Sequence, residues 1–193
     1  MPRAGLSSER VVSEAALVAD EGGLDALTLA AVAQRLGVTL PSLYKHVDGI
    51  DGLRRDLAVL GMAELARVLT RGVLGRTGRE ALEGVAHGYR DFARSRPGLY
   101  AASVRAPRPG DAAHEAVSQD ALDVAVALVR SYGIDGADIV HAIRILRASL
   151  HGFVSLEAGG AFGMPQDVER SFEHLVDVLH LALEGWPPHG EVR

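Results

Sequence analysis

Apolar residues recur at steps of three and four along almost the whole chain, the spacing that places side chains on one face of an α-helix. No run of β-branched residues alternates with polar ones, as a strand would require. The pattern predicts an all-α protein of about nine helices. Serine, threonine and glycine residues supply the caps, and the predicted helices cover residues 8–22, 29–36, 40–46, 48–70, 77–96, 97–104, 112–132, 136–158 and 165–183.

Helix length divides the chain into two parts. Residues 1–48 hold three short predicted helices joined by tight turns, whereas the later helices are mostly longer. Two prolines and a glycine between Arg105 and Asp111 place a loop within the second part. We therefore predict a three-helix N-terminal domain over residues 1–48 and a helical C-terminal domain over residues 49–193.

The turn between the second and third predicted helices carries the most specific pattern in the sequence. Gly37 permits a left-handed turn there, and the neighbouring Val38 can fill the corner. Two short helices that meet across such a turn describe a helix-turn-helix. The third helix, with Thr39 as its predicted N-cap, then exposes groups that suit phosphates and base edges; these belong to Thr39, Ser42, Tyr44, Lys45 and His46.

The overall charge gives no support to nucleic-acid binding, because the chain carries a formal net charge of −5. Any positive charge that meets DNA must therefore be local. Between Arg35 and Arg55 four basic and two acidic residues leave a net charge of +2, and the one lysine of the chain, Lys45, lies on the exposed side of the third helix. A three-helix structural subdomain with an ordinary polar face remains the alternative for these features.

The stretch from Gly23 to Leu53 resembles the DNA-binding domain of the TetR family of transcriptional regulators. A threonine opens the second helix, a glycine turn precedes the third, and Leu-Tyr-Lys-His closes it, all in the family's register. The segment from Leu150 to Glu157 also resembles the penultimate helix of a subgroup with a Trp-His-Gly-type C-terminal domain. The resemblance implies a homodimeric repressor that leaves a near-palindromic DNA operator when a small molecule binds the C-terminal domain.

The same resemblance implies roles for individual residues. Base edges would lie nearest Thr39, Leu40, Ser42 and Lys45, and phosphates nearest Thr28, Tyr44 and His46. Two positions depart from the family, since Ile50 and Ala30 stand where many relatives carry a lysine and an arginine. Both departures weaken the grip on phosphate, so we expect a shallow salt dependence of DNA binding; the residues that could compensate are Arg3, Arg10, Arg54 and Arg55.

The last two predicted helices each carry an apolar stripe. Two such helices from each of two chains would form a four-helix dimer interface. The alternative is that the stripes pack within one chain. The residues predicted for the interface are Ile143, Leu146, Leu150, Phe153, Phe172, Leu175, Val176 and Leu179.

A pocket for a small-molecule effector needs apolar walls and a few polar groups. Each candidate could equally belong to the core or the surface, and the identity of the effector is not readable from them. Arg144 or Arg147, if buried, could bind an acidic effector. The pocket candidates are Met62, Leu65, His87, Tyr89, Phe92, Tyr100, Leu128, His151 and Trp186.

Other functional classes find less support. The absence of cysteine excludes disulfides, thiolate catalysis and cysteine-ligated metal centres. Asp138-x-x-His141 and Asp177-x-x-His180, with Glu83 and Glu157, suggest a di-metal helical-bundle enzyme, but that alternative leaves the N-terminal domain unexplained.

A helical interaction module without DNA binding is the other alternative. We expect no enzyme activity, cofactor or metal, since the common catalytic and phosphate-binding motifs are absent. No signal peptide or membrane span is evident, so a cytoplasmic protein is expected.

Overall fold

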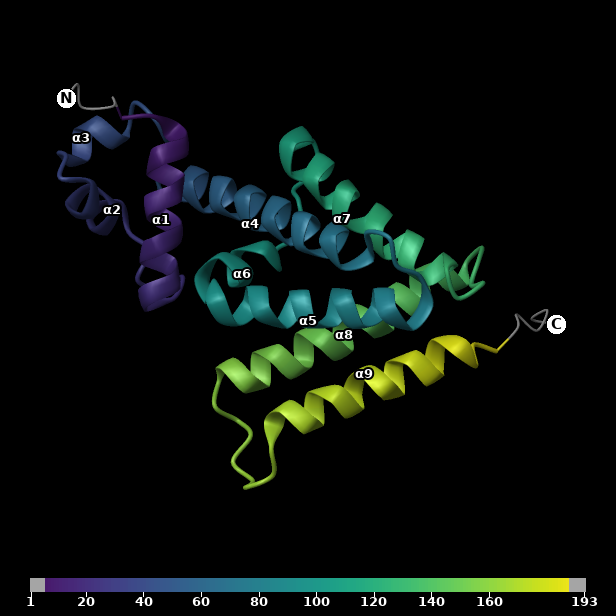
Figure 1. Ribbon diagram of the computed structural model, residues 1–193. Helices are drawn as coiled ribbons and strands as arrows, with labels where there is room; N and C mark the ends of the chain where they lie inside the picture. The colour runs from purple at the N-terminus through teal and green to yellow at the C-terminus, as the bar shows by residue number, and fades with distance from the viewer. Residues whose placement is uncertain (1–5, 188–193) are drawn as a thin grey trace. The chain divides into compact units, whose positions relative to one another are not determined.

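The computed structural model describes residues 6–187, and this part of the chain forms nine α-helices and no strand (Figure 1). The predicted all-α class is therefore confirmed. The helices are α1 (Ser8–Gly22), α2 (Leu29–Leu36), α3 (Leu40–Leu43), α4 (Gly49–Val73), α5 (Gly78–Ser95), α6 (Pro97–Ser103), α7 (Ala112–Arg130), α8 (Asp138–Ala158) and α9 (Val168–Glu184).

Three of the helices begin at a side chain that caps their first turn. The Ser7 side chain accepts a hydrogen bond from the Arg10 N–H at 3.2 Å and so caps α1. The Thr28 hydroxyl accepts one from the Ala31 N–H at 3.1 Å at the start of α2. Asp167 caps α9, which begins three residues later than predicted. These bonds satisfy N–H groups that have no partner within the helix.

The helices pack into two compact units. The first contains the chain up to Leu65 together with Ser95–Ser118, and the second contains Ala66–Arg94 and the chain from Gln119 onward. The first unit thus extends beyond the predicted N-terminal domain, because it also takes in the start of α4, all of α6 and the first turns of α7.

Glycines explain why α6 joins the first unit. A Cβ atom on Gly98 would overlap the backbone of Ala19, so only glycine lets α6 approach α1 this closely. A Cβ on Gly61 of α4 would lie 2.5 Å from the Leu99 carbonyl oxygen. Helix α6 therefore packs backbone-to-backbone against both α1 and α4.

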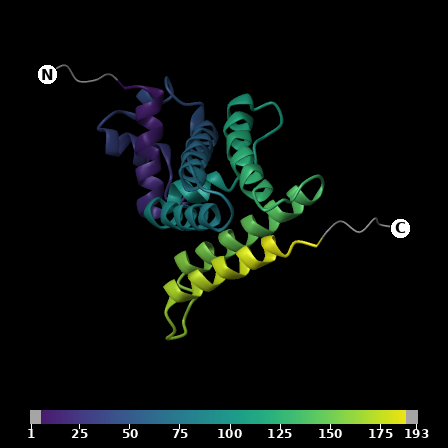
Figure 2. The same ribbon diagram turned by 45° about the vertical axis from the view of Figure 1, so that its right-hand side comes forward.

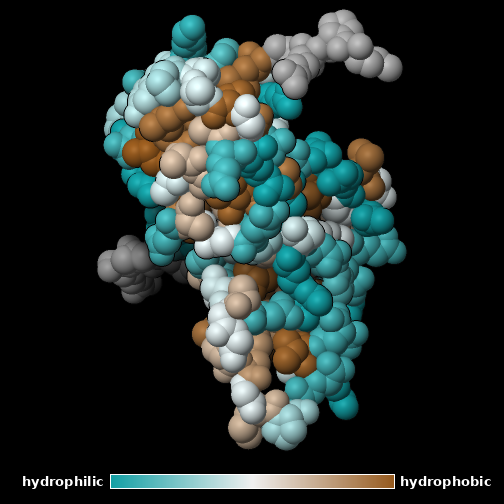
Figure 3. Space-filling model, turned by 90° about the vertical axis from the view of Figure 1, so that its left-hand side faces the viewer, coloured by the Kyte–Doolittle hydropathy of each residue, from teal (hydrophilic) through white to brown (hydrophobic). Residues whose placement is uncertain are grey.

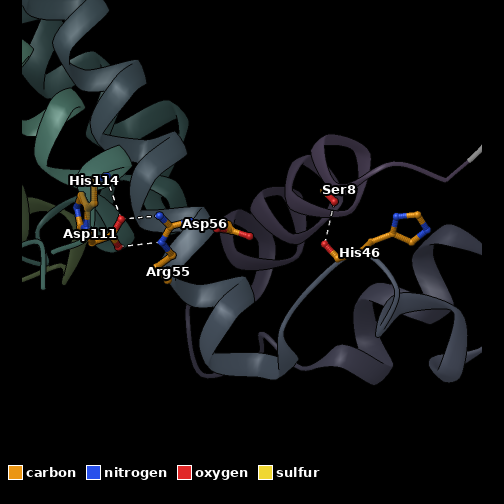
Figure 4. Close-up of polar contacts among 6 residues, drawn as sticks. All are labelled: Ser8, His46, Arg55, Asp56, Asp111 and His114. Atoms are coloured by element: carbon orange, nitrogen blue, oxygen red, sulfur yellow. Dashed lines mark hydrogen bonds and ion pairs between the residues drawn. The ribbon is translucent and has the colours of Figure 1, made fainter.

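Two carboxylates add polar contacts within this unit. Asp20 of α1 accepts hydrogen bonds from the Leu99 N–H at 3.0 Å and from the Arg96 guanidinium, so it caps α6. Asp111, just before α7, accepts two hydrogen bonds from Arg55 of α4, one of them at 2.8 Å (Figure 4). The arginine lowers the pKa of Asp111 to about 2. These contacts tie α6 to α1 and the start of α7 to α4.

A buried arginine organises the second unit. Arg90 of α5 is only 4% exposed, and it donates to both carboxylate oxygens of Glu157 on α8 at 2.9 and 2.7 Å. Its third nitrogen donates to Glu169 of α9 at 2.8 Å. The guanidinium also lies 4.5 Å from the Phe172 ring centroid and 5.7 Å from that of Phe153. One side chain therefore joins α5 to both α8 and α9.

Helices α8 and α9 run side by side, as Figures 1 and 2 show. Among the described helices, α8 is the one long and apolar enough to cross a membrane by length and composition, with 28% of its apolar window buried. An apolar helix that packs against other helices passes the same test, so this is weak evidence for a membrane span.

Candidate nucleic-acid interface

The predicted glycine turn between α2 and α3 is present. Gly37 adopts a left-handed conformation with φ of 65°, and its N–H reaches back to the carbonyl of Ala33. The next N–H, that of Val38, also bonds to the Ala33 carbonyl at 3.0 Å. Such bonds close the C-terminus of a helix and turn the chain sharply. The turn sets α3 directly after α2, as a helix-turn-helix requires.

The third helix is shorter than predicted. It ends at Leu43 instead of continuing to His46. The His46 N–H bonds to the Leu43 carbonyl at 2.8 Å, three residues back, so the chain tightens into a turn there. Thr39 occupies the N-cap position of α3 as predicted, but its hydroxyl lies 2.9 Å from the Ser42 hydroxyl and caps no backbone N–H.

Most of the predicted DNA-contact residues are exposed. Tyr44 is 59% exposed and Leu40 is 39% exposed, and Thr28, Thr39 and Lys45 are exposed as well. Ser42 and His46 are half-buried.

Helix α1 braces the end of this turn. The Ser8 hydroxyl donates to the His46 carbonyl at 2.9 Å, and the His46 imidazole points away from that bond (Figure 4). The contact couples α1 to the end of the turn that follows α3.

Fewer cations are available to DNA than the sequence suggests. Arg35 is held by Glu14 at 2.9 Å and by Glu21 at 2.8 Å. Arg55, one of the predicted compensating residues, is engaged by Asp56 and Asp111. The local net charge of +2 therefore overstated the charge free to meet phosphate.

The remaining basic groups are few. Lys45 and Arg54 are exposed and have no ion-pair partner within residues 6–187. Arg10 is exposed, and Arg3 lies outside the described residues.

The apolar stripes predicted as a dimer interface face the interior of one chain. Most of their residues are already covered without a second copy, so they form core. This burial supports the alternative of packing within one chain, and their role in a dimer interface stays a prediction. Leu146, Leu150, Phe172, Val176 and Leu179 are buried, and Ile143, Phe153 and Leu175 are half-buried.

Other faces of α8 and α9 carry exposed apolar side chains. On α8, Ile145 is 46% and Leu156 is 50% exposed, and on α9, Val178 is 61% and Leu181 is 64% exposed. Gly152 lies at helical spacing between the first two, with open space around its Cβ position. The face drawn in Figure 3 shows hydrophobic surface among hydrophilic surface, both over the N-terminal helices and near the α8–α9 connection.

The predicted pocket residues fall in both units. Met62, Leu65 and Tyr100 are buried in the first. In the second, Tyr89, Phe92 and Leu128 are buried, His151 and Trp186 are half-buried, and His87 is exposed with its ring 5.4 Å from that of Phe172. The assignment of these residues to an effector pocket stays a prediction.

The two arginines predicted as possible contacts of an acidic effector are not buried. Arg144 and Arg147 are exposed, whereas the buried arginine is Arg90, whose charge Glu157 and Glu169 balance. The helical spacing of Arg90 does not mark it, among many arginines, as the one that is buried.

The carboxylates needed by the di-metal alternative are paired with arginines. Glu83 and Asp177 both bind Arg79, and Glu157 binds Arg90. Within residues 6–187 no group of three or more histidine and acidic side chains is placed to hold a metal ion.

Comparison with known proteins decides between the remaining alternatives. A family model described as "Tetracyclin repressor-like, C-terminal domain" matches residues 82–179. The HTH-type transcriptional regulator YobS of Bacillus subtilis is 36% identical over 171 residues, which cover 88% of each chain. The chain belongs to the TetR family of transcriptional regulators. The HTH-type regulator Rv0681 of Mycobacterium tuberculosis is 35% identical over 188 residues, or 97% of this chain and 86% of that one.

A TetR structure supports the family fold. A TetR variant from Acinetobacter baumannii AYE, solved in complex with minocycline, superposes with a TM-score of 0.71 at 24% identity and covers 96% of this chain and 100% of its own. Together with Rv0681, this match extends over both the N-terminal helices and the helical body of the TetR-family chain.

Proposed function

We propose that this TetR-family regulator is a homodimeric repressor that binds a near-palindromic operator and leaves it when a small molecule binds the helical body. The observation that carries the DNA-binding role is the α2–turn–α3 arrangement, which presents the exposed side chains of Leu40, Tyr44 and Lys45. In this proposal residues 1–48 bind DNA, and residues 49–193 bind the effector and a second copy.

The side chains around α3 divide by the part of DNA they suit. Thr39, Ser42 and Lys45 can hydrogen-bond base edges, and Leu40 suits the methyl group of thymine. Thr28, Tyr44 and His46 would contact phosphates, and such contacts do not distinguish one base sequence from another.

The exposed faces of α8 and α9 suit a second copy of the chain. Ile145, Leu156, Val178 and Leu181 place large apolar side chains on two neighbouring helices, which is how four-helix interfaces form. A two-fold dimer would set its recognition helices about 34–36 Å apart, one turn of DNA.

Leu181→Glu tests the dimer, because it places a charge on the proposed interface. We expect native mass spectrometry at micromolar concentration to show dimer for the wild type and monomer for the variant. The matched control is Val140→Glu, since Val140 is 49% exposed on a different face of α8. A monomeric wild type, or a dimeric Leu181→Glu variant, would contradict this interface.

DNA affinity should depend only weakly on salt. Each neutralised phosphate adds about −0.9 to the slope of log affinity against log salt concentration. With Arg35 and Arg55 held in ion pairs, few cations of each copy remain for phosphate. A slope that corresponds to about eight or more phosphates per dimer would contradict this count.

Release would occur by a population shift between two conformations. Helix α4 is continuous from Gly49 to Val73, so it links the helix-turn-helix to the body of the chain. An effector that favours one position of α4 changes the spacing of the two recognition helices. Release requires the effector to weaken DNA binding, so unchanged or stronger binding in its presence would contradict this mechanism. The site of action would be the cytoplasm, where the operator lies.

The deciding experiment selects genomic fragments with the purified protein and then compares variants on the selected site. We expect Lys45→Ala and Tyr44→Ala each to weaken binding by about five- to 150-fold, which is about 1–3 kcal/mol. The matched control is Arg130→Ala, which removes an exposed charge from the second unit. Unchanged binding by both variants would refute the role of α3, and the absence of any selected fragment would favour an interaction module without DNA binding.

A further inference from the structure

Two buried polar atoms on α7 lack partners in the part of the chain that the structure describes. His114 is 3% exposed, and neither its Nε2 atom nor the Oγ atom of Ser118 has a hydrogen-bond partner there. The residues are four apart, so their side chains lie on one face of α7, one turn apart. Buried polar groups are nearly always hydrogen-bonded, and an unpaired one destabilises the protein. Two such atoms together leave hydrogen-bonding groups on one face of α7 that a bound molecule can satisfy.

Neighbouring polar groups in the first unit are satisfied. Ser103 is 1% exposed, and its hydroxyl donates to the Tyr100 carbonyl at 2.7 Å. Asp111 lies one turn before His114, accepts a hydrogen bond from the His114 N–H at 3.2 Å, and is paired with Arg55 (Figure 4). The two unpaired atoms are therefore exceptions in a unit whose other buried groups are paired.

We propose that His114 Nε2 and Ser118 Oγ are polar contacts of the effector site, and that the effector is an uncharged, largely apolar molecule with a hydroxyl or carbonyl oxygen. This inference rests on the proposed function and names the ligand class for it. A neutral imidazole and a hydroxyl each donate or accept, so they match either kind of oxygen.

Charge and burial argue for a neutral, apolar ligand. Arg55, which contacts Asp111 at this end of α7, is balanced by Asp56 and Asp111. A charged ligand would need a buried opposite charge that is unpaired, which His114 and Ser118 do not provide. The buried side chains of α4 and α6 in the same unit are mainly apolar.

The site also lies next to a contact that reaches the DNA-binding end of α4. Asp111 lies just before α7 and accepts a hydrogen bond from the His114 N–H in the first turn of that helix, and Asp111 is also paired with Arg55. An effector that shifts His114 on binding therefore also shifts a turn that is hydrogen-bonded to α4.

The first test measures stability without any ligand. Removing an unpaired buried hydroxyl should stabilise the protein, so we expect Ser118→Ala to raise Tm by about 2–4 °C. His114→Phe, which keeps a planar ring, should raise Tm as well. The matched control is Ser103→Ala, which breaks a hydrogen bond and should lower Tm. A lower Tm for Ser118→Ala would show that the hydroxyl is already satisfied and would overturn the proposal.

The second test uses two probes that differ by one hydroxyl group, 4-propylphenol and propylbenzene, titrated calorimetrically into the full chain. We expect the wild type and Ser103→Ala to bind the phenol about tenfold more tightly than the hydrocarbon, the value of one good hydrogen bond. The preference should fall to about twofold or less in His114→Phe and Ser118→Ala. Equal or undetectable binding of the two probes to the wild type, or an undiminished preference in both variants, would overturn the proposal.

Neither measurement involves DNA, so the effector-site proposal and the repressor proposal can be refuted independently of each other. DNA selection that succeeds while both tests fail refutes this site and leaves the repressor proposal standing. Both tests succeeding while no DNA is selected refutes the repressor and retains a ligand site.

Discussion

Replacing Arg90 with methionine tests the role of the buried arginine in the second unit. Methionine keeps an unbranched apolar stem that can still pack against Phe153 and Phe172, but it removes every hydrogen bond to Glu157 and Glu169. The substitution therefore separates what the ion pairs contribute to the free energy of unfolding from what side-chain packing contributes.

The expected loss follows from the exposure of each partner. Removing one member of a fully buried ion pair costs about 3–5 kcal/mol, because a charge is left unpaired. Here the side chain of Glu157 is 19% exposed and that of Glu169 is 50% exposed, so water solvates part of the charge that remains. We expect a loss of about 2–3 kcal/mol, which lowers Tm by about 5–10 °C for a chain of this size.

Thermal unfolding followed by circular dichroism measures the effect. Arg90→Met combined with Glu157→Gln should recover much of the stability, because the second change removes the unpaired charge. The matched control is Arg79→Met. Arg79 also binds two acids, Glu83 and Asp177, but its side chain is 51% exposed, so little change in Tm is expected.

Acid should erase the difference between wild type and Arg90→Met. The arginine lowers the pKa of Glu157 below its ordinary value of 4.5. The pair therefore stabilises the folded state above that value and loses its effect as pH falls through the lowered pKa. The reasoning is refuted if Arg90→Met unfolds within about 2 °C of the wild type, or if the double variant is as unstable as the two single losses added together.

Three further predictions concern the close helix contact and two ionisable groups. Gly98→Ala should destabilise the protein by about 3 kcal/mol, since its Cβ overlaps the backbone of Ala19; a urea titration with unchanged midpoint would contradict this. Asp111, whose pKa Arg55 lowers to about 2, should stabilise the protein above its ordinary pKa of 3.8 and lose this effect toward pH 2, so Asp111→Asn should flatten the dependence of the urea midpoint on pH in that range. Burial raises the pKa of Tyr132 from 10.0 to about 12. The stability of the folded state should therefore fall between these pH values, because the unfolded chain loses the tyrosine proton first. Tyr132→Phe should remove the last step of tyrosinate absorbance in a pH titration.

The helices and their ends were predictable where the signals are local. The α2 helix lies between Thr28 and Gly37 as predicted, because a hydroxyl cap and a left-handed glycine act on their own neighbours in the chain. One exception was α3, whose end depends on how Tyr44–His46 close a turn and on the Ser8 contact with that turn. The candidate DNA-contact residues came from the same local pattern, and five of the seven are exposed.

Which face of a long helix is covered depended on the tertiary structure. Periodicity marks an apolar stripe on α8 and α9, but Leu150 and Val176 proved to be core, whereas Leu156 and Val178 remain on the surface. Capping and helix formation act within a few residues, so the amino-acid order suffices to place them. Burial and ion pairing depend on partners tens of residues away, such as Arg90 with Glu157 or Arg55 with Asp111, and only the folded chain brings those partners together.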